Sequence, residues 1–167
     1  MTLSNRMKSA AYVFALCLLA LVLSPRTADA ATATTTFAVS ATVQATCLVS
    51  ATPMSFGTYT GAVVNTTSTV SVTCTNTTTY NVGLSAGLAT GATVTARQMT
   101  GPSSAVLGYS LFSDSSRSVN WGQTGTETVA GTGNGSSQAL TVYGQTTAGQ
   151  YVTPGSYTDT ITATVTY

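Results

Sequence analysis

The chain has 167 residues, of which only 5% are charged, and it contains no histidine. Its formal net charge is +1, and it has neither a basic patch for nucleic acid nor an acidic tail. General acid–base catalysis by histidine, an activated Ser–His pair and a His/Cys metal site all lack the residues they need. The composition therefore argues against an enzyme and predicts no cofactor, no metal and no nucleic-acid partner.

The first 30 residues have the features of a secretory signal peptide. Arg6 and Lys8 form a short basic head, residues 10–23 are almost wholly apolar, and Ala28-Asp29-Ala30 is a small-x-small cleavage pattern. A membrane anchor is the alternative, but the apolar run is shorter than the ~20 residues that a spanning helix needs. We therefore expect a signal peptide helix over 1–30 and no stable membrane span after cleavage.

Residues 31–167 have the size of one domain and predict an all-β fold. They keep two arginines and three acids, a formal charge of −1, and about a quarter of them are threonine. Threonine, valine and tyrosine suit a pleated, half-buried surface. No segment of this region shows an apolar repeat at helical spacing over three turns.

Residues 34–47 show period-two alternation, with apolar residues at every odd position from Phe37 to Cys47, the pattern of a strand with one buried face. No Gly, Pro, Asn or Asp occurs between Ala31 and Thr52, so no turn is predicted to fold this strand back. From the residues alone, two interpretations stay open. The segment is the first strand of its own sandwich, or its apolar face enters the core of another molecule.

Cys47 and Cys74 are the two cysteines outside the signal peptide. An even number of cysteines in an exported chain predicts a disulfide. Their places in the alternating patterns put both side chains on inward faces of strands, which suits a bridge in the core. Two free buried thiols are the alternative.

Further strands are predicted by the same alternation near residues 69–74, 80–86, 106–112 and 139–145. Residues 113–137 are expected to form a long surface loop with one short strand near 127–130. Thr153-Pro154-Gly155-Ser156 predicts a turn before a last strand over 157–167. Short strands separated by turns are typical of a sandwich or a barrel.

The last predicted strand places Ile161, Ala163, Val165 and Tyr167 on one face, and Asp159 is its one departure from the apolar phase. The chain stops without a hairpin after this strand. We therefore expect an open apolar edge, which is a place where another strand can add.

Several motifs, taken in order, resemble the spore coat protein U domain family, which includes pilin subunits of the archaic chaperone–usher pathway. They are MSFGTY at 54–59, LGYSLFSD at 107–114, Trp121-Gly122 and the closing GSYTDTITATVTY at 155–167. The resemblance implies an immunoglobulin-like sandwich without its final strand. The N-terminal extension of the next subunit would complete it. For this sequence it implies a donor-strand extension over 31–46 and a pilin-like sandwich over 47–167.

The same resemblance implies the roles of particular residues. The donor strand would insert Phe37, Val39, Ala41 and Val43. The acceptor groove would be lined by Ile161, Ala163, Val165 and Tyr167, with its other wall around Cys47 to Val49.

The implied function is that of a secreted structural subunit. It would polymerise head to tail by donor-strand exchange into a surface pilus or fibre used in adhesion and biofilm formation. The implied partners are copies of itself or homologous pilin subunits, a periplasmic chaperone and an outer-membrane usher. Export would run through the periplasm to the cell surface.

Three alternatives are left open. A surface-binding adhesin-type module would use Trp121 with Tyr109 or Tyr151 as a stacking platform. A coat-layer protein of the same fold is a second alternative. Catalysis would need a carboxylate pair such as Asp114 and Glu127, although Asp114 sits in a pattern typical of a solvated turn.

Overall fold

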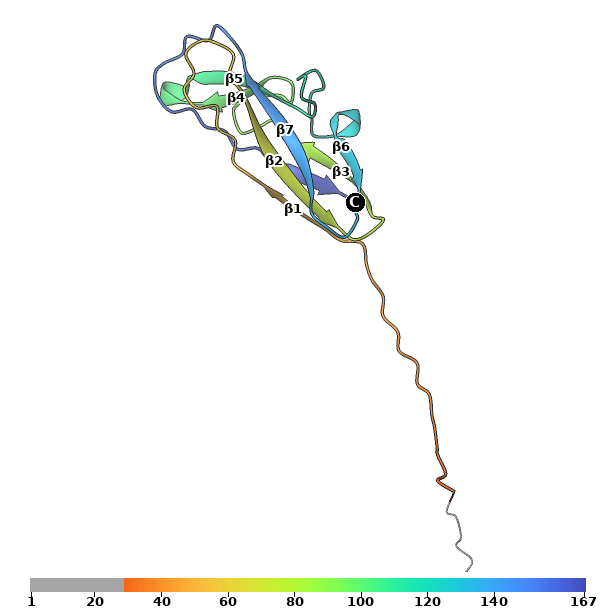
Figure 1. Ribbon diagram of the computed structural model, residues 1–167. Helices are drawn as coiled ribbons and strands as arrows, with labels where there is room; N and C mark the ends of the chain where they lie inside the picture. Colours follow the sequence, from red (N-terminus) through yellow and green to blue (C-terminus); the bar gives the residue numbers. More distant parts are fainter. Residues whose placement is uncertain (1–28) are drawn as a thin grey trace, which may run out of the picture. The chain divides into compact units, whose positions relative to one another are not determined.

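The computed structural model describes residues 29–167, and the predicted signal peptide helix lies outside them. The chain divides into two units, Met1–Ala41 and Thr42–Tyr167. All strands lie in the second unit (Figure 1). They are β1 (Cys47–Ala51), β2 (Asn65–Cys74), β3 (Thr79–Leu84), β4 (Arg97–Thr100), β5 (Val106–Phe112), β6 (Val129–Thr132), β7 (Gln138–Thr146) and β8 (Ala163–Thr166). Two single-turn 3-10 helices, Pro102–Ser104 and Gly125–Glu127, complete the elements described.

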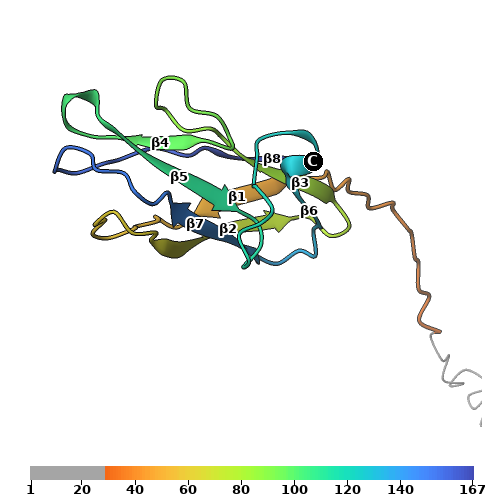
Figure 2. The same ribbon diagram turned by 90° about the horizontal axis from the view of Figure 1, so that it is seen from above.

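The strands form two sheets packed face to face, which confirms the predicted all-β sandwich. One sheet has the order β1-β2-β7-β5-β4 and the other the order β6-β3-β8. Every pairing is antiparallel. Figure 2 shows β3 and β8 on one side of the domain and β2 and β7 on the other.

The core lies between the sheets and follows the alternation in the sequence. Strand β5 buries Leu107, Tyr109 and Leu111, and the intervening residues are only partly covered. The same period of two in β2, β3 and β7 buries Val70, Val72, Cys74, Tyr80, Val82, Leu84 and Val142. Each large apolar side chain buried in this way contributes roughly 1.5–3 kcal/mol to folding.

The last segment differs from the single strand predicted over 157–167. Thr158 pairs with Thr100 of β4, in the first sheet, through two main-chain hydrogen bonds of 2.9 and 3.1 Å. The segment then crosses to the second sheet, where only Ala163–Thr166 pairs with β3. The crossing begins at Asp159, whose carboxylate accepts hydrogen bonds from Tyr109 of the first sheet and from Leu88 in the segment after β3, so the one irregularity in the pattern marks the bend.

The short strand β4 was not predicted, because its four residues RQMT show no alternation. The predicted short strand near 127–130 is present two residues later, as β6. Trp121 lies in the core with 1% of its surface exposed, and its indole Nε1 donates to the Val82 carbonyl at 2.9 Å.

Arg97, the first residue of β4, is fully buried and holds several loops together. Its Nε donates to the Ser85 carbonyl at 2.8 Å and its Nη1 to the Val94 carbonyl at 2.5 Å. Its Nη2 donates to the carbonyls of Leu84 at 3.0 Å and Trp121 at 2.8 Å. Burial lowers the pKa of Arg97. Four carbonyls of three separate segments therefore depend on one guanidinium.

Replacing Arg97 tests this dependence. Arg97→Lys should lower the free energy of unfolding by about 2–3 kcal/mol, because one ammonium group cannot reach four carbonyls around a guanidinium site. Urea unfolding followed by the fluorescence of Trp121 measures the loss. Arg117→Lys, in a surface loop, is the matched control and should cost less than ~1 kcal/mol. Equal losses would show that Arg97 has no special role.

Candidate functional site

Strand β8 has a hydrogen-bonded neighbour on one side only. Its register with β3 runs from Ala163 opposite Leu84 to Thr166 opposite Asn81. The Ser85 N–H donates to the Thr162 carbonyl at 3.0 Å, so the even-numbered residues of β8 bond toward β3. The main-chain groups of Ala163 and Val165 therefore point the other way, where no strand of residues 29–167 is bonded to them.

Strand β1 is an open edge for the same reason. Its bonds to β2 pass through even-numbered residues, as the flanking bonds of Thr46 and Thr52 to β2 show. The alternation turns the main-chain groups of Cys47, Val49 and Ala51 away from β2. Within the part of the chain that the structure describes, β1 pairs with β2 alone. Two open edges thus belong to the two sheets on the same side of the sandwich.

A cavity of about 560 Å³ opens between residues 51–56 and residues 157–163, and we call it the core slot. Ile161 and Ala163 line its wall. Val165 packs against the core without lining the slot, and Tyr167 is 58% exposed. The floor is made of buried core side chains from both sheets: Val70, Leu84, Tyr109, Leu111 and Val142. The slot therefore reaches down to the core side chains of both sheets along this side.

Strands β1 and β8 themselves lie close together. Their Cα atoms approach within 8 Å of each other. A strand placed between two others needs two spacings of about 4.8 Å, or ~9.6 Å in all. A further strand therefore fits only if β1 and β8 move apart, whereas the core slot already has room for side chains.

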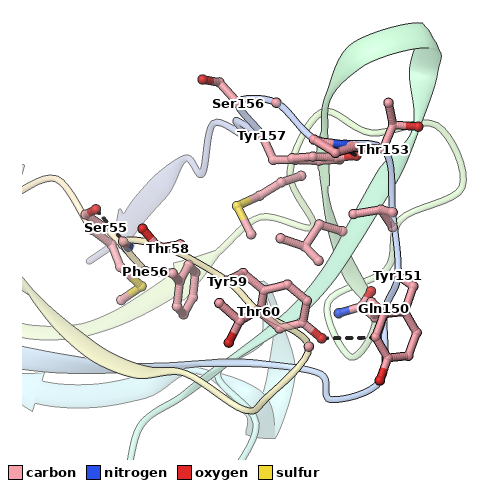
Figure 3. A pocket seen from close by; sticks show the side chains of 18 residues that line it. Ser55, Phe56, Thr58, Tyr59, Thr60, Gln150, Tyr151, Thr153, Ser156 and Tyr157 are labelled. Carbon is pink, nitrogen blue, oxygen red and sulfur yellow. Dashed lines mark hydrogen bonds between the residues drawn. The ribbon is translucent and has the colours of Figure 1, made fainter.

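A second cavity, of about 670 Å³, continues the core slot toward the loops of residues 54–61 and 150–157, and we call it the tyrosine hollow (Figure 3). The two cavities share four lining residues: Met54, Phe56, Met99 and Tyr157. Figure 3 shows the rings of Tyr59, Tyr151 and Tyr157 around it. Its lining contains no charged residue.

Asp159 fixes the wall of the core slot in place. One carboxylate oxygen accepts from the Tyr109 hydroxyl at 2.6 Å, and the other accepts from the N–H groups of Leu88 at 2.8 Å and Thr160 at 2.7 Å. Burial and the hydrogen bond to Asp159 raise the pKa of Tyr109. Gly87 has a φ of +92°, and a Cβ there would lie 2.0 Å from the carboxylate, so only glycine fits.

The four predicted donor residues lie in the extended segment before β1. Phe37, Val39 and Val43 are 84%, 85% and 85% exposed, and Ala41 is exposed as well. Residues 29–46 belong to neither sheet. The structure therefore assigns no strand to residues 37–43. An apolar row that faces solvent needs another apolar surface to cover it.

The predicted disulfide is confirmed. Cys47 and Cys74 are bonded, with their Cα atoms 4.1 Å apart in directly opposed positions of β1 and β2. The bond ties β1, one of the two open edges, to a strand of the core. The alternative of two free thiols is wrong.

The residues suggested for other functions are used structurally. Trp121 and Tyr109 are buried, so they cannot form a stacking platform, whereas Tyr151 is 92% exposed. The Asp114 carboxylate accepts hydrogen bonds from the Ser116 hydroxyl, the Ser118 N–H and hydroxyl, and the Val119 N–H. These bonds lower the pKa of Asp114, as expected for a solvated turn.

Two findings apply to residues 29–167. They contain no group of three or more His, Cys, Asp or Glu side chains arranged to hold a metal ion. Over the same residues, no helix has both the length and the apolar character needed to span a membrane.

The fold agrees with the comparisons to known proteins. The family model of the Spore Coat Protein U domain matches residues 33–164. Protein U of Myxococcus xanthus is 34% identical over 157 residues, which cover 84% of this chain and 88% of that protein. Together with the solved structure described next, the family match indicates a pilin-type structural subunit, a class not known as enzymes. The chain belongs to the Spore Coat Protein U domain family.

A solved structure shares the architecture. It is the CsuC-CsuE chaperone–tip adhesion subunit pre-assembly complex from archaic chaperone-usher Csu pili of Acinetobacter baumannii, and one of its chains is 25% identical to this protein with a TM-score of 0.54. The match covers 75% of this chain and 40% of that chain, so this protein corresponds to less than half of its solved relative.

The disulfide should determine how firmly β1 is held. Replacing both Cys47 and Cys74 by alanine should lower the free energy of unfolding by roughly 3–4 kcal/mol, as expected for a loop of this length. The main-chain amides of β1 should lose more protection from hydrogen exchange than those of β7. Uniform loss of protection in both strands would contradict a local role.

The Tyr109–Asp159 contact predicts a dependence on alkaline pH. Since the pKa of Tyr109 is higher in the folded state, its contribution is complete below the ordinary tyrosine pKa of about 10 and is lost as the pH rises above that value. The urea midpoint should therefore fall above about pH 10. In Tyr109→Phe the urea midpoint should fall less over the same pH range. If the midpoint of this variant falls as steeply with pH as that of the wild type, the Tyr109–Asp159 contact does not contribute to stability.

Proposed function

We propose that this protein is an exported structural subunit that polymerises head to tail by donor-strand exchange. The observation that carries the proposal is the combination within one chain of an exposed apolar row and an open, core-lined slot. Phe37, Val39 and Val43 form the row, and two unpaired strand edges flank the side on which the core slot opens. In a pair of subunits, the row of one covers the slot of the other.

The proposed register follows from the two sets of residues. An antiparallel donor with Phe37 opposite Tyr167 places Val39 opposite Val165, Ala41 opposite Ala163 and Val43 opposite Ile161. The odd-numbered donor residues then turn their main-chain groups to those of β8, which are free on that side. The even-numbered donor residues turn theirs toward the free groups of β1.

The energies are sufficient for a stable junction. Three large apolar side chains contribute roughly 1.5–3 kcal/mol each when they are fully buried. The main-chain ladder adds hydrogen bonds of about 0.5–1.5 kcal/mol each. Part of this gain is spent on moving β1 and β8 apart by at least ~2 Å and on ordering the extension.

An open core also argues for a partner before assembly. Partly exposed apolar residues such as Phe56 and Ile161 line the slot and would favour aggregation of free subunits. We infer that a periplasmic chaperone occupies the slot until another subunit replaces it and that an outer-membrane usher receives the subunit. The similarity to a chaperone–subunit pre-assembly complex supports the chaperone. A surface pilus or fibre active in adhesion and biofilm formation is the proposed product.

An arginine introduced on either face of the donor strand tests the proposal. Val39→Arg should prevent polymerisation, because an unpaired charge in the core slot costs several kcal/mol. Thr42→Arg is the matched control, since its side chain lies on the opposite face of the donor strand and stays in water. The readout is the ladder of multimers that resist detergent on an unheated gel.

A deletion separates donation from acceptance. A chain without residues 31–43 should accept a donor strand but not supply one, so adding it to wild-type subunits should shorten the ladder. If Val39→Arg and Thr42→Arg both give the wild-type ladder, residues 37–43 are not a donor strand.

A further inference from the structure

The tyrosine hollow remains unexplained by a donor strand that covers only residues 161–167 of the acceptor. We propose that it is the docking surface for the body of the donor subunit, and specifically for the residues around Leu48 at the start of β1. This inference rests on the proposed function. It adds to each junction a contact between folded domains.

The first argument is continuity. The hollow and the core slot share Met54, Phe56, Met99 and Tyr157, so a strand that leaves the slot at Ile161 passes directly into the hollow. An antiparallel donor has its C-terminal end there. In the proposed register Val43 lies opposite Ile161, so the donor residues after Val43 lie toward the bend at Asp159 and toward Tyr157, which is a lining residue of the hollow.

The second argument is the unexplained apolar surface at the start of β1. Leu48 is 71% exposed, although it lies in a strand, and its side chain is on the outer face of the sheet beside Thr73. It is two residues from Thr46, so it lies within ~7 Å of the end of the extension. When the extension fills a neighbour's slot, Leu48 is brought to the hollow of that neighbour.

The third argument is the exposed ring on the rim. Tyr151 is 92% exposed, and a Cβ built on Gly61 would lie 3.4 Å from its ring, which places the ring at the edge of the loop of residues 54–61. Tyrosine in this position is typical of protein contacts, because it supplies a large apolar area and a polar end. Residues 44–51 of the donor carry no charge, and neither does the lining of the hollow.

The hydrogen bonds favour a protein over a saccharide as the occupant. The Gln150 side chain is bonded to both main-chain groups of Gly108 and to the Thr147 carbonyl. The Tyr59 hydroxyl donates to Thr147 and accepts from the Gln150 N–H, and the Tyr157 hydroxyl donates to Thr153. A sugar site needs polar groups that converge on the ligand. These groups instead face their own backbone.

Opposite charges introduced on the two sides of the junction provide the test. Leu48→Lys and Tyr151→Glu are each introduced into the full chain, alone and together, with Ser50→Lys and Thr141→Glu as exposed controls on the same sheet. All variants should still form the ladder, because the donor strand is unchanged. Each single variant at the junction should dissociate at least ~10-fold faster in urea than its control, and the double variant should recover most of this loss through the new ion pair.

The remaining outcomes decide against the inference in different ways. If the single variants dissociate like their controls, or if the double variant shows no recovery, the hollow does not receive the region of Leu48. Loss of binding on a glycan array by Tyr151→Glu, with unchanged fibres, would identify a saccharide site instead. A wild-type chain that forms no ladder in the presence of its chaperone and usher would overturn the proposed function itself.

Discussion

Every strand at the edge of a sheet leaves a row of main-chain donors and acceptors that need partners. In this protein β1 and β8 leave such rows on the same side of the sandwich, one from each sheet. The side chains beneath them belong to the core, because Leu84, Leu111 and Val142 line the core slot. The domain has therefore both unpaired backbone and open apolar packing at one place, and a single inserted strand would satisfy both.

The strands that could be predicted are those whose side chains alternate between core and solvent. Strand β5 was predicted with its observed limits, since Leu107, Tyr109 and Leu111 repeat with a period of two. The same pattern put Ile161 and Ala163 on one apolar face, and both line the core slot. The disulfide was predictable because Cys47 and Cys74 occupy inward positions of their strands.

The features that could not be predicted depend on contacts between distant segments. The sequence RQMT of β4 gives no sign that Arg97 is buried. Its guanidinium is held by main-chain carbonyls of other segments, which have no side-chain signal in the sequence: Leu84, Ser85, Val94 and Trp121. The bend in the last segment had one visible sign, the acid at Asp159, but its partners Tyr109 and Leu88 lie far away in sequence. The close approach of β1 and β8 depends on the packing of whole sheets and has no local signal.

The short connection between the extension and β1 has a consequence for the order of events in assembly. Cys47 lies at the end of β1 that faces the β2–β3 turn, near the Tyr167 end of β8. The chain from Val43 to Cys47 spans at most ~14 Å, whereas Ile161 lies about 20 Å along the last segment from Tyr167. A subunit cannot place its own extension antiparallel to its own β8. A tether normally gives a segment a high effective concentration at a nearby site. If the extension is the proposed donor strand, however, its own groove is out of reach in this register, and filling that groove would require a second molecule.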